Sequence, residues 1–459
     1  MPISRLRWAI PLMLTALMAP VPHAALAQSN EELFAFNRQV DKLIQAGRHS
    51  EALNTAQRAL SLVERRFGAD HPHSASWINM IAYLHNVQGR YGDAERLYKR
   101  ALAVREKALG PNHPDVAATL NNLAGSYQEQ ARYAEAEPLF RRALAIRQKA
   151  HGPSHADVAE SLTNLAVLLS AQGRYAEAEP LLRQGLTIRE KVRGSESLEV
   201  ANSLFGLAQL YRRQGRYAEA ELYAKRDAAI QEKVLGPNHL DTGAAIDNLA
   251  SVYFYLGRFH DAEPLFRRAL AIREKLLGPD HHLVGATVGN LAATYNSLNK
   301  LSEAEPLYLR SLRIRERALG ADNAALAAPH NNLASLYHQL GRYAEAETHY
   351  ERAVAIWEKV LGPDYPDLGI ALYNLAVAYR VQGKLVEAEA AYRRSAEIAI
   401  RRSRRSAGAL GETMTGTVES ESTRARKRFA EWIKVAYQLG ERRGALRAEF
   451  ARKMFEAAQ

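Results

Sequence analysis

The chain has 459 residues, of which 47% are hydrophobic and 8% aromatic, and its formal net charge is +11. The absence of cysteine excludes disulfides, thiolate metal sites and a cysteine nucleophile from this polypeptide. Because residues 401–459 hold 14 basic and 7 acidic side chains, the preceding chain is nearly neutral, which argues against a nucleic-acid-binding groove along it.

Residues 1–27 have the pattern of a cleaved signal peptide. Arg5 and Arg7 precede an apolar run over residues 8–19, and the small residues Ala25 and Ala27 stand where a signal peptidase reads. A membrane anchor is the alternative, but a spanning helix needs about 20 apolar residues. We therefore expect export, with the periplasm as the first choice of compartment and secretion as the second.

Residues 28–402 are dominated by one period of 42 residues. Glycine recurs at this spacing from Gly68 to Gly362, and extrapolation backwards places a ninth unit around His49. An aromatic or leucine residue keeps the same spacing: Tyr91, Tyr133, Tyr175, Tyr217, Phe259, Leu301, Tyr343 and Leu385. This periodicity predicts one array of nine repeats.

Each repeat has the pattern of two amphipathic helices, for example residues 115–130 and 134–150, with apolar residues at spacings of three and four. The turn between them has Ala131 at a position that is glycine in most other repeats, which predicts a positive φ. The fold class is therefore all-α, and each hairpin completes its core with its neighbours.

The residues of the third repeat resemble the tetratricopeptide repeat, and the 42-residue period is similar to that of kinesin-light-chain-like proteins. The motif residues are Asn122, Leu123, Ala124, Tyr127, Tyr133, Ala136, Phe140 and Ala143. The resemblance implies a right-handed superhelical solenoid of antiparallel helix hairpins, whose first helices line a concave groove. It also implies a non-enzymatic scaffold that binds a protein or peptide partner there.

Asparagines in the first helices are the candidate peptide-binding residues, because a side-chain amide can bond the backbone of any extended peptide. The alternative is a scaffold role, in which the amides bond their own or the neighbouring repeat. Six asparagines are in register, namely Asn122, Asn164, Asn248, Asn290, Asn332 and Asn374. Asn121 and Asn331 each add a second asparagine directly before an in-register one.

The fifth repeat departs most from the pattern. Gly206 replaces the asparagine, residues 194–198 replace the usual Gly-Pro-x-His-Pro segment, and Asp227 stands where other repeats have alanine. Two interpretations stay open, an anion-binding patch or hinge and a drifted repeat. A buried carboxylate needs a partner, so we expect Asp227 to be paired or partly exposed, with Arg226, Arg212 or Arg213 as candidates.

The recurring histidines of the inter-repeat loops are too far apart to share one metal ion, because successive repeats lie at least a helix-packing distance of roughly 8 to 10 Å apart. We expect them to cap the next helix. The recurring carboxylates Glu135 and Glu137 are expected on a solvated face. The sequence indicates no cofactor, metal or catalytic site. The recurring histidines are His71, His113, His155, His239 and His281.

The C-terminal region is predicted as a flexible linker over residues 403–423 and a helical cap or tail over residues 424–459. An apolar face in the tail favours a cap that covers the last repeat. The alternative is contact of the basic residues with an acidic partner or a membrane surface. The face comprises Phe429, Trp432, Ile433, Ala436 and Leu439.

The tail also resembles the region that precedes the peptidase in bacterial proteins joining such repeats to a caspase-like CHAT domain. Phe429, Phe450 and residues 455–459 carry this likeness. It implies an alternative function, a regulatory or sensing module of a CHAT-type peptidase system that lacks its catalytic domain in this chain.

Overall fold

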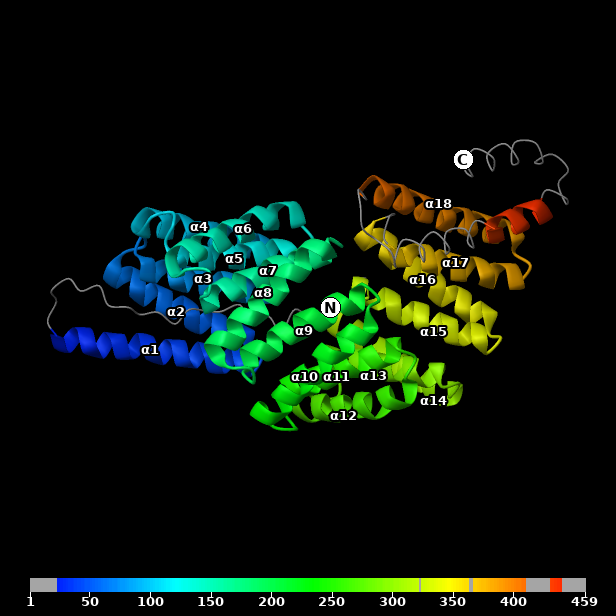
Figure 1. Cartoon of the computed structure of the whole chain (residues 1–459), viewed down its shortest axis with the longest axis horizontal. Helices are drawn as coiled ribbons and strands as arrows, with labels where there is room; N and C mark the ends of the chain where they lie inside the picture. The colour runs from blue at the N-terminus through cyan, green and yellow to red at the C-terminus, as the bar shows by residue number, and fades with distance from the viewer. Residues whose placement is uncertain (1–22, 322, 363–365, 410–429, 440–459) are drawn as a thin grey trace. The chain divides into compact units, whose positions relative to one another are not determined.

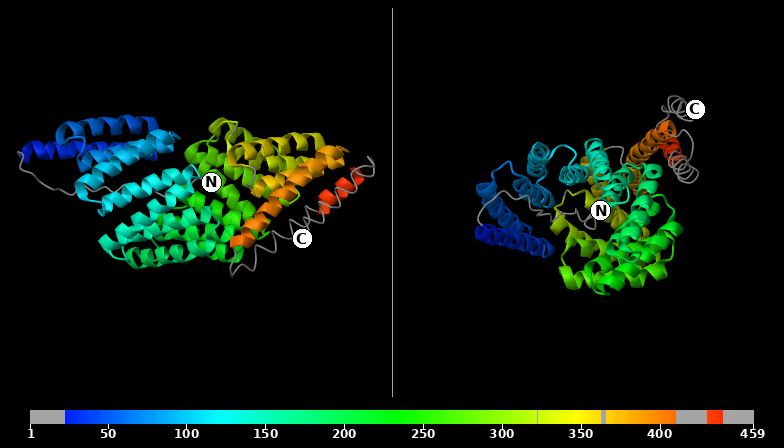
Figure 2. Two further views of the ribbon diagram at one scale, coloured as in Figure 1. Left: turned by 90° about the horizontal axis from the view of Figure 1, so that it is seen from above. Right: turned by 60° about the vertical axis from the view of Figure 1, so that its left-hand side comes forward.

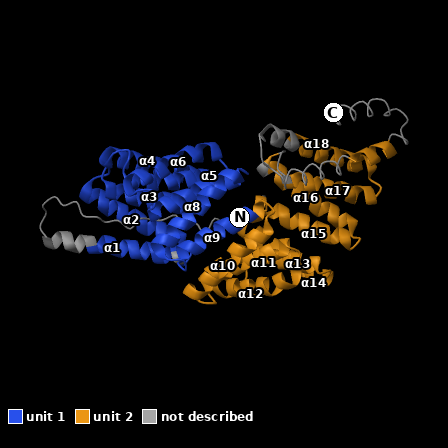
Figure 3. Ribbon diagram, viewed as in Figure 1, with its two compact units in different colours: residues 1–211 blue, residues 212–459 orange. Residues whose placement is uncertain are grey.

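The computed structural model describes residues 23–321, 323–362, 366–409 and 430–439 (Figure 1). Within these residues the chain is helical and has no strand. It divides into two compact units, residues 1–211 and residues 212–459, and the division falls inside the fifth repeat (Figure 3). Among the described residues no helix is both long and apolar enough to cross a membrane.

Unit 1 contains four hairpins and the first helix of the fifth, and each first helix packs on its second helix. Its helices are α1 (His23–Gln45), α2 (His49–Phe67), α3 (Pro72–Val87), α4 (Tyr91–Leu109), α5 (Pro114–Glu129), α6 (Tyr133–His151), α7 (Ala156–Ala171), α8 (Tyr175–Arg193) and α9 (Leu198–Arg213), whose last two residues belong to unit 2.

Unit 2 continues the same alternation, and Figure 2 shows the hairpins from two further sides. Its helices are α10 (Tyr217–Leu235), α11 (Leu240–Tyr255), α12 (Phe259–Leu277), α13 (His282–Ser297), α14 (Leu301–Leu319), the 3₁₀ turn η1 (Ala324–Leu326), α15 (Ala327–Gln339), α16 (Tyr343–Leu361), α17 (Pro366–Val381) and α18 (Leu385–Ala409).

The 42-residue marker turns out to be the first residue of every second helix, from His49 in α2 to Leu385 in α18. The periodic glycines close these helices, for example Gly110 with φ 85°. The predicted all-α class is confirmed, with helices in repeating pairs. The sequence boundaries were off by one residue, because α6 begins at Tyr133 and ends at His151.

The turn inside each hairpin has the predicted positive φ. Gly89 has φ 74° and Gly341 has φ 74°, whereas Ala131 has φ 58° at the same position of the third repeat. A residue with a Cβ atom is strained in this left-handed region. The α5/α6 hairpin therefore stores strain in its turn that the glycine-containing hairpins avoid.

The loop histidines cap the first helices, as predicted. Nδ1 of His113 accepts a hydrogen bond from the backbone N–H of Asp115, at 3.2 Å, and so satisfies a donor at the start of α5. The same contact recurs at His71, His155, His239 and His281.

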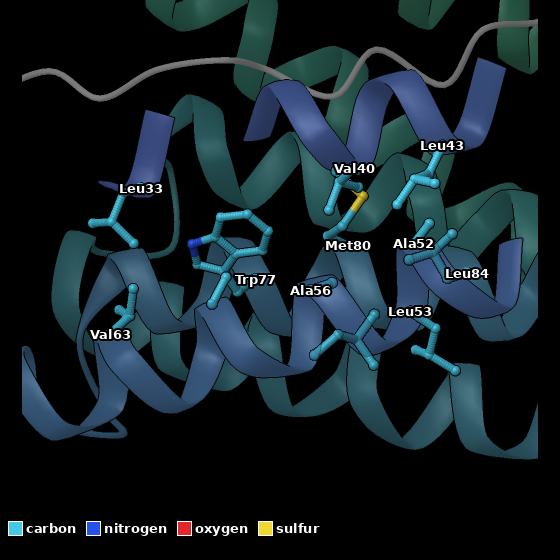
Figure 4. Packing of buried hydrophobic residues seen from close by; sticks show 12 residues of the cluster. Leu33, Val40, Leu43, Ala52, Leu53, Ala56, Val63, Trp77, Met80 and Leu84 are labelled. Atoms are coloured by element: carbon cyan, nitrogen blue, oxygen red, sulfur yellow. The ribbon is translucent and has the colours of Figure 1, made fainter. Parts of the chain in front are cut away.

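The first hairpin buries its apolar face against α3 (Figure 4). Leu33 and Val40 of α1 lie with Ala56 of α2 and with Trp77 and Met80 of α3 in one cluster of buried residues. Small residues in α2 let the helices approach closely, while the large residues of α3 fill the space between them. The core of the first hairpin is thus completed by the first helix of the next hairpin.

In six repeats a cation before the second helix pairs with a carboxylate of the preceding repeat. Arg132 Nη1 lies 2.7 Å from the carboxylate of Glu95, and Arg174 Nη1 lies 2.7 Å from that of Glu137. The expectation for Glu137 needs correction, since its side chain is only 19% exposed and lies between two arginines. Glu135 is 52% exposed, as expected. The same tie recurs for Arg258–Glu221, Lys300–Glu263, Arg342–Glu305 and Lys384–Glu347.

The helix over residues 430–439 packs on α17 and α18, and the cap over residues 424–459 stays a prediction. Val435 is fully buried in a cluster with Ala388 and Tyr392, and Trp432 Nε1 donates to Glu389 Oε1 at 2.9 Å. The sequence prediction of its apolar face missed Val435. Helix α18 runs to Ala409, past the predicted end of the array, and the rest of the predicted linker lies outside the described residues.

Candidate peptide-binding site

The first helices of neighbouring repeats contact one another within each unit. In unit 1 these contacts join α3, α5 and α7, and in unit 2 they join α11, α13, α15 and α17. All the predicted asparagines lie in the central turns of these helices. The structure therefore brings the amides of each unit onto adjacent helices.

In unit 1 the asparagines are buried and bond within the scaffold. Nδ2 of Asn122 donates to Oδ1 of Asn79 in the preceding repeat, at 3.3 Å. Nδ2 of Asn121 donates to Oγ of Ser161 in the following repeat, also at 3.3 Å. Asn164 is buried as well. These contacts support the scaffold interpretation for Asn121 and Asn122.

In unit 2 the exposure is greater. Asn248 on α11 is buried, whereas Asn290 on α13, Asn331 and Asn332 on α15, and Asn374 on α17 are half-buried and so reach solvent. The amides of unit 2 are better candidates for a ligand than those of unit 1.

The position seven residues after the in-register asparagine of each helix is exposed. A separation of seven residues is two helical turns, so both residues lie on one face of the helix. The exposed side chain is different on each helix: Tyr255, Ser297, Gln339 and Val381. We call the set of Asn248, Asn290, Asn332 and Asn374 with these four residues the amide face of unit 2.

At the start of this face, aromatic residues surround an arginine. The rings of Tyr217 and Tyr255 stack at 5.4 Å, and the guanidinium carbon of Arg212 lies 5.4 Å from the centre of the Tyr255 ring. Burial lowers the pKa of Arg212. Tyr255 is nevertheless 47% exposed, so the ring beside this partly desolvated cation reaches solvent.

Buried arginines in the second helices were missed by the sequence interpretation. Arg147 of α6 donates through Nη1 to the backbone oxygen of Asp157, at 2.9 Å, and to Oγ of Ser161 in α7, at 3.0 Å. Its Nη1 also lies 3.3 Å from the carboxylate of Glu160. Each such arginine binds the start of the next first helix, and Arg105, Arg189 and Arg273 do the same at their joints.

A signal for these contacts was present in the sequence. Each of these four arginines has a hydroxyl residue 14 positions later, in the pairs Arg105–Thr119, Arg147–Ser161, Arg189–Ser203 and Arg273–Thr287. In the fifth repeat both partners change together, to Gln231 and Ala245. The seventh repeat keeps the arginine, as Arg315, although Pro329 stands 14 positions later, so the spacing is a partial signal for contact.

Asp227 of α10 was expected to be paired or partly exposed. Its side chain is completely buried, so the expectation of partial exposure is wrong. Gln231, one turn later, donates through Nε2 to Oδ1 of Asp227 at 3.4 Å. The residue that replaces the buried arginine in this repeat thus contacts the unusual carboxylate, a contact that the sequence interpretation did not foresee.

The α15/α16 hairpin has two histidines where other repeats have aliphatic residues. His330 occupies the position of Val288 and Leu372, and His349 occupies the position of Leu307. Their Nδ1 atoms lie 2.9 Å apart, so one proton is shared between them. Burial, with repulsion from His349 and Arg352, lowers the pKa of His330 to about 4.

Helix α15 is also shorter than the other first helices. The loop before it has no capping histidine; Asn323 caps the turn η1 instead, accepting from the N–H of Ala325 at 2.9 Å. The helix then starts at Ala327, and Pro329 lies in its first turn, where a missing N–H costs little.

Solved structures with a similar fold include kinesin-light-chain-like repeat proteins. Repeats of a Podosopora anserina kinesin light chain protein are 29% identical, covering 45% of this chain and 97% of that one with a TM-score of 0.40. BtubC (BKLC) from P. vanneervenii is 25% identical, covering 53% and 93% with a TM-score of 0.41.

The quorum sensor NprR from B. thuringiensis, in its apo form, is 15% identical, covering 71% of this chain and 87% of its own with a TM-score of 0.54, a likeness of fold alone. No curated protein matches the chain. The family model for the tetratricopeptide repeat matches overlapping segments that together span residues 43–317 and 325–401. The chain belongs to the tetratricopeptide repeat family.

Proposed function

We propose that the chain is a non-enzymatic scaffold that binds an extended segment of a protein or peptide partner along the amide face of unit 2. One observation carries the proposal: amides one period apart lie on first helices that contact one another, and a chemically different exposed residue follows each by two turns. Amides can bond any peptide backbone, while the variable residues can distinguish side chains.

The spacing of the helices sets the expected register of the ligand. Packed helices lie roughly 10 Å apart, and an extended peptide advances about 3.3 Å per residue. Successive amides would therefore meet about every third residue of the ligand. A peptide that reaches all four helices needs about ten residues.

The test is selection of a random decapeptide display library on the full chain, followed by affinity measurement of the selected peptides. Three half-buried amides are removed in Asn290→Ala/Asn332→Ala/Asn374→Ala. Each lost hydrogen bond costs about 1 kcal/mol, so affinity should fall about 100-fold. A folded triple variant that binds the same peptides equally well would rule out this face.

Two further variants make the experiment specific. Ser302→Ala/Thr348→Ala truncates exposed polar side chains on the second helices α14 and α16, and it should leave affinity unchanged. Tyr255→Ser copies the residue that α13 has at the equivalent position, and it should alter which peptide sequences are selected while binding persists.

We further propose export, because of the basic, apolar and small-residue pattern over residues 1–27; residues 1–22 lie outside the described part of the structure. Mass spectrometry of the chain from its native host should find Gln28 as the N-terminus, and an uncleaved chain would contradict the proposal. The alternative role beside a CHAT-type peptidase rests on Phe429, Phe450 and residues 455–459, also outside the described residues.

A further inference from the structure

A cluster of three potential metal ligands lies at the joint between α6 and α7 in unit 1. His151 is the last residue of α6, His155 caps α7, and Asp157 is in the first turn of α7. One nitrogen or oxygen atom from each residue can be chosen so that all three lie within 4.8 Å of one another. Both histidines are exposed and Asp157 is half-buried, so a solvated ion can reach them.

We propose that His151, His155 and Asp157 form a binding site for a divalent first-row transition metal ion such as Zn²⁺, Co²⁺ or Ni²⁺. Imidazole suits these ions, and one carboxylate with two imidazoles leaves positions for water. Histidines of different repeats are too far apart to share one ion. His151 and His155, in contrast, flank a single loop.

The distances fit such an ion. Oδ2 of Asp157 lies 3.6 Å from Nε2 of His151 and 3.7 Å from Nδ1 of His155. Ligand atoms about 2.1 Å from a tetrahedral ion are roughly 3.4 Å apart. Coordination of one ion also requires the two imidazole rings to open, because they stack with their centres 4.4 Å apart and their planes inclined by 24°.

The sequence is unusual at His151 alone. The equivalent residues in the other repeats are Phe67, Leu109, Arg193, Leu235, Leu277, Leu319 and Leu361. The loops that follow Leu109 and Leu235 have the same capping histidine and aspartate, His113 with Asp115 and His239 with Asp241, each pair 3.8 Å apart. These two loops have two of the ligands and lack the third, which makes them internal controls.

Packing is the competing explanation for His151. Phe67 stacks on His71 at 5.0 Å in the first joint, much as His151 stacks on His155. Packing needs only a ring, whereas a metal site needs its nitrogen. Coordination through Nδ1 of His155 would also displace the bond from the N–H of Asp157, whose loss costs about 1 kcal/mol and limits the affinity.

The experiment titrates Co²⁺ and Zn²⁺ into the tag-free full chain, following the visible spectrum of Co²⁺ and the heat of Zn²⁺ binding. The matched variant is His151→Phe, which keeps the ring as in Phe67. Loss of even an outer-shell partner lowers metal affinity about tenfold, so this variant should lose at least that much. Equal affinity and stoichiometry in the folded variant and the original chain would overturn the proposal.

Two more variants extend the test. One removes a second ligand, and the other asks whether three such residues are sufficient to bind an ion. His155→Asn keeps a capping side chain, as Asn323 shows, and should also weaken metal binding at least tenfold. Leu109→His completes the triad with His113 and Asp115 and should add one equivalent of bound Co²⁺. A folded Leu109→His chain without the extra equivalent would show that three such residues are insufficient, and would also overturn the proposal.

Discussion

Two hairpins, α5/α6 in unit 1 and α15/α16 in unit 2, differ in how they hold buried polar groups. Arg147 of α6 reaches a backbone oxygen, a hydroxyl and a carboxylate, so its charge is matched by several acceptors. His330 and His349 face each other and share one proton. The first arrangement stays bonded over a wide pH range, whereas the second loses its hydrogen bond when both histidines are protonated, because neither Nδ1 can then accept.

The difference shows that burial alone does not decide whether a polar residue stabilises a repeat. A buried group with matched partners contributes to stability. A pair of identical titratable groups destabilises the fold when both groups carry a charge at the same time.

Removal of the buried arginine Arg147 should cause the largest loss of stability. Arg147→Ala removes the buried cation that bonds Ser161 and lies 3.3 Å from Glu160, and breaking a buried charged contact costs about 3 kcal/mol. Hydrogen exchange of the amides in α6 and α7 should show the loss of protection, because repeat arrays open locally. The control Arg147→Gln/Ser161→Ala copies the natural pair Gln231 and Ala245 and should cost less. Equal losses would contradict the pairing argument.

Acid should weaken the α15/α16 hairpin. The pKa of His330 is about 4 in the fold, below its ordinary value of 6.5, so the unfolded chain binds more protons between these values. Stability is therefore complete above pH 6.5 and is lost as the pH falls toward 4. Between pH 8 and pH 5 the local free energy of unfolding should fall by about 2 kcal/mol.

The neighbouring charges act on this pair in opposite directions. Arg352 opposes protonation of His330, and Glu316 lies 3.8 Å from Nε2 of His330. Burial lowers the pKa of His349, and Glu345 offsets part of that shift. His330→Leu/His349→Leu restores the aliphatic residues of other repeats and should remove the acid sensitivity of exchange in α15 and α16. An unchanged pH dependence in this variant would exclude the pair as its source.

The smallest effect should come from the turns. Ala131→Gly relieves a left-handed alanine in the α5/α6 hairpin and should stabilise it by about 1 kcal/mol. Gly341→Ala creates the same strain in the α15/α16 hairpin, where nothing lies within 4 Å of the added Cβ atom, and should destabilise it by a similar amount. Local hydrogen exchange would measure both, and effects of the same sign would contradict the conformational explanation.

Most of the fold could be predicted because its signals are local and repeated. Three markers recur at a spacing of 42 residues: the first residue of the second helix, the glycine at its end and the capping histidine. Tyr133, Gly110 and His113 are examples, and each repeat gives a new instance of the same signal. The short helix α15 was not predicted, because its cause is the absence of a cap together with Pro329.

The candidate site was predicted only in outline. The register placed the asparagines on the first helices, but it could not show that Asn122 is buried against Asn79 while Asn290 reaches solvent. The exposure of an amide depends on its neighbours in other repeats. The buried Arg147 was missed because charged residues are normally assigned to the surface, although the hydroxyl at Ser161 was a usable signal.

The ties between repeats have a consequence for how such a chain can change in length. Arg132 and Glu95 are separated by 37 positions, and so are Arg174 and Glu137. An in-frame deletion of residues 110–151 would leave Arg174 at the same separation from Glu95, with an equivalent glycine at the junction. Recombination between copies could therefore add or remove a repeat without requiring a new interface, so that copy number can vary more freely than the residues within a copy.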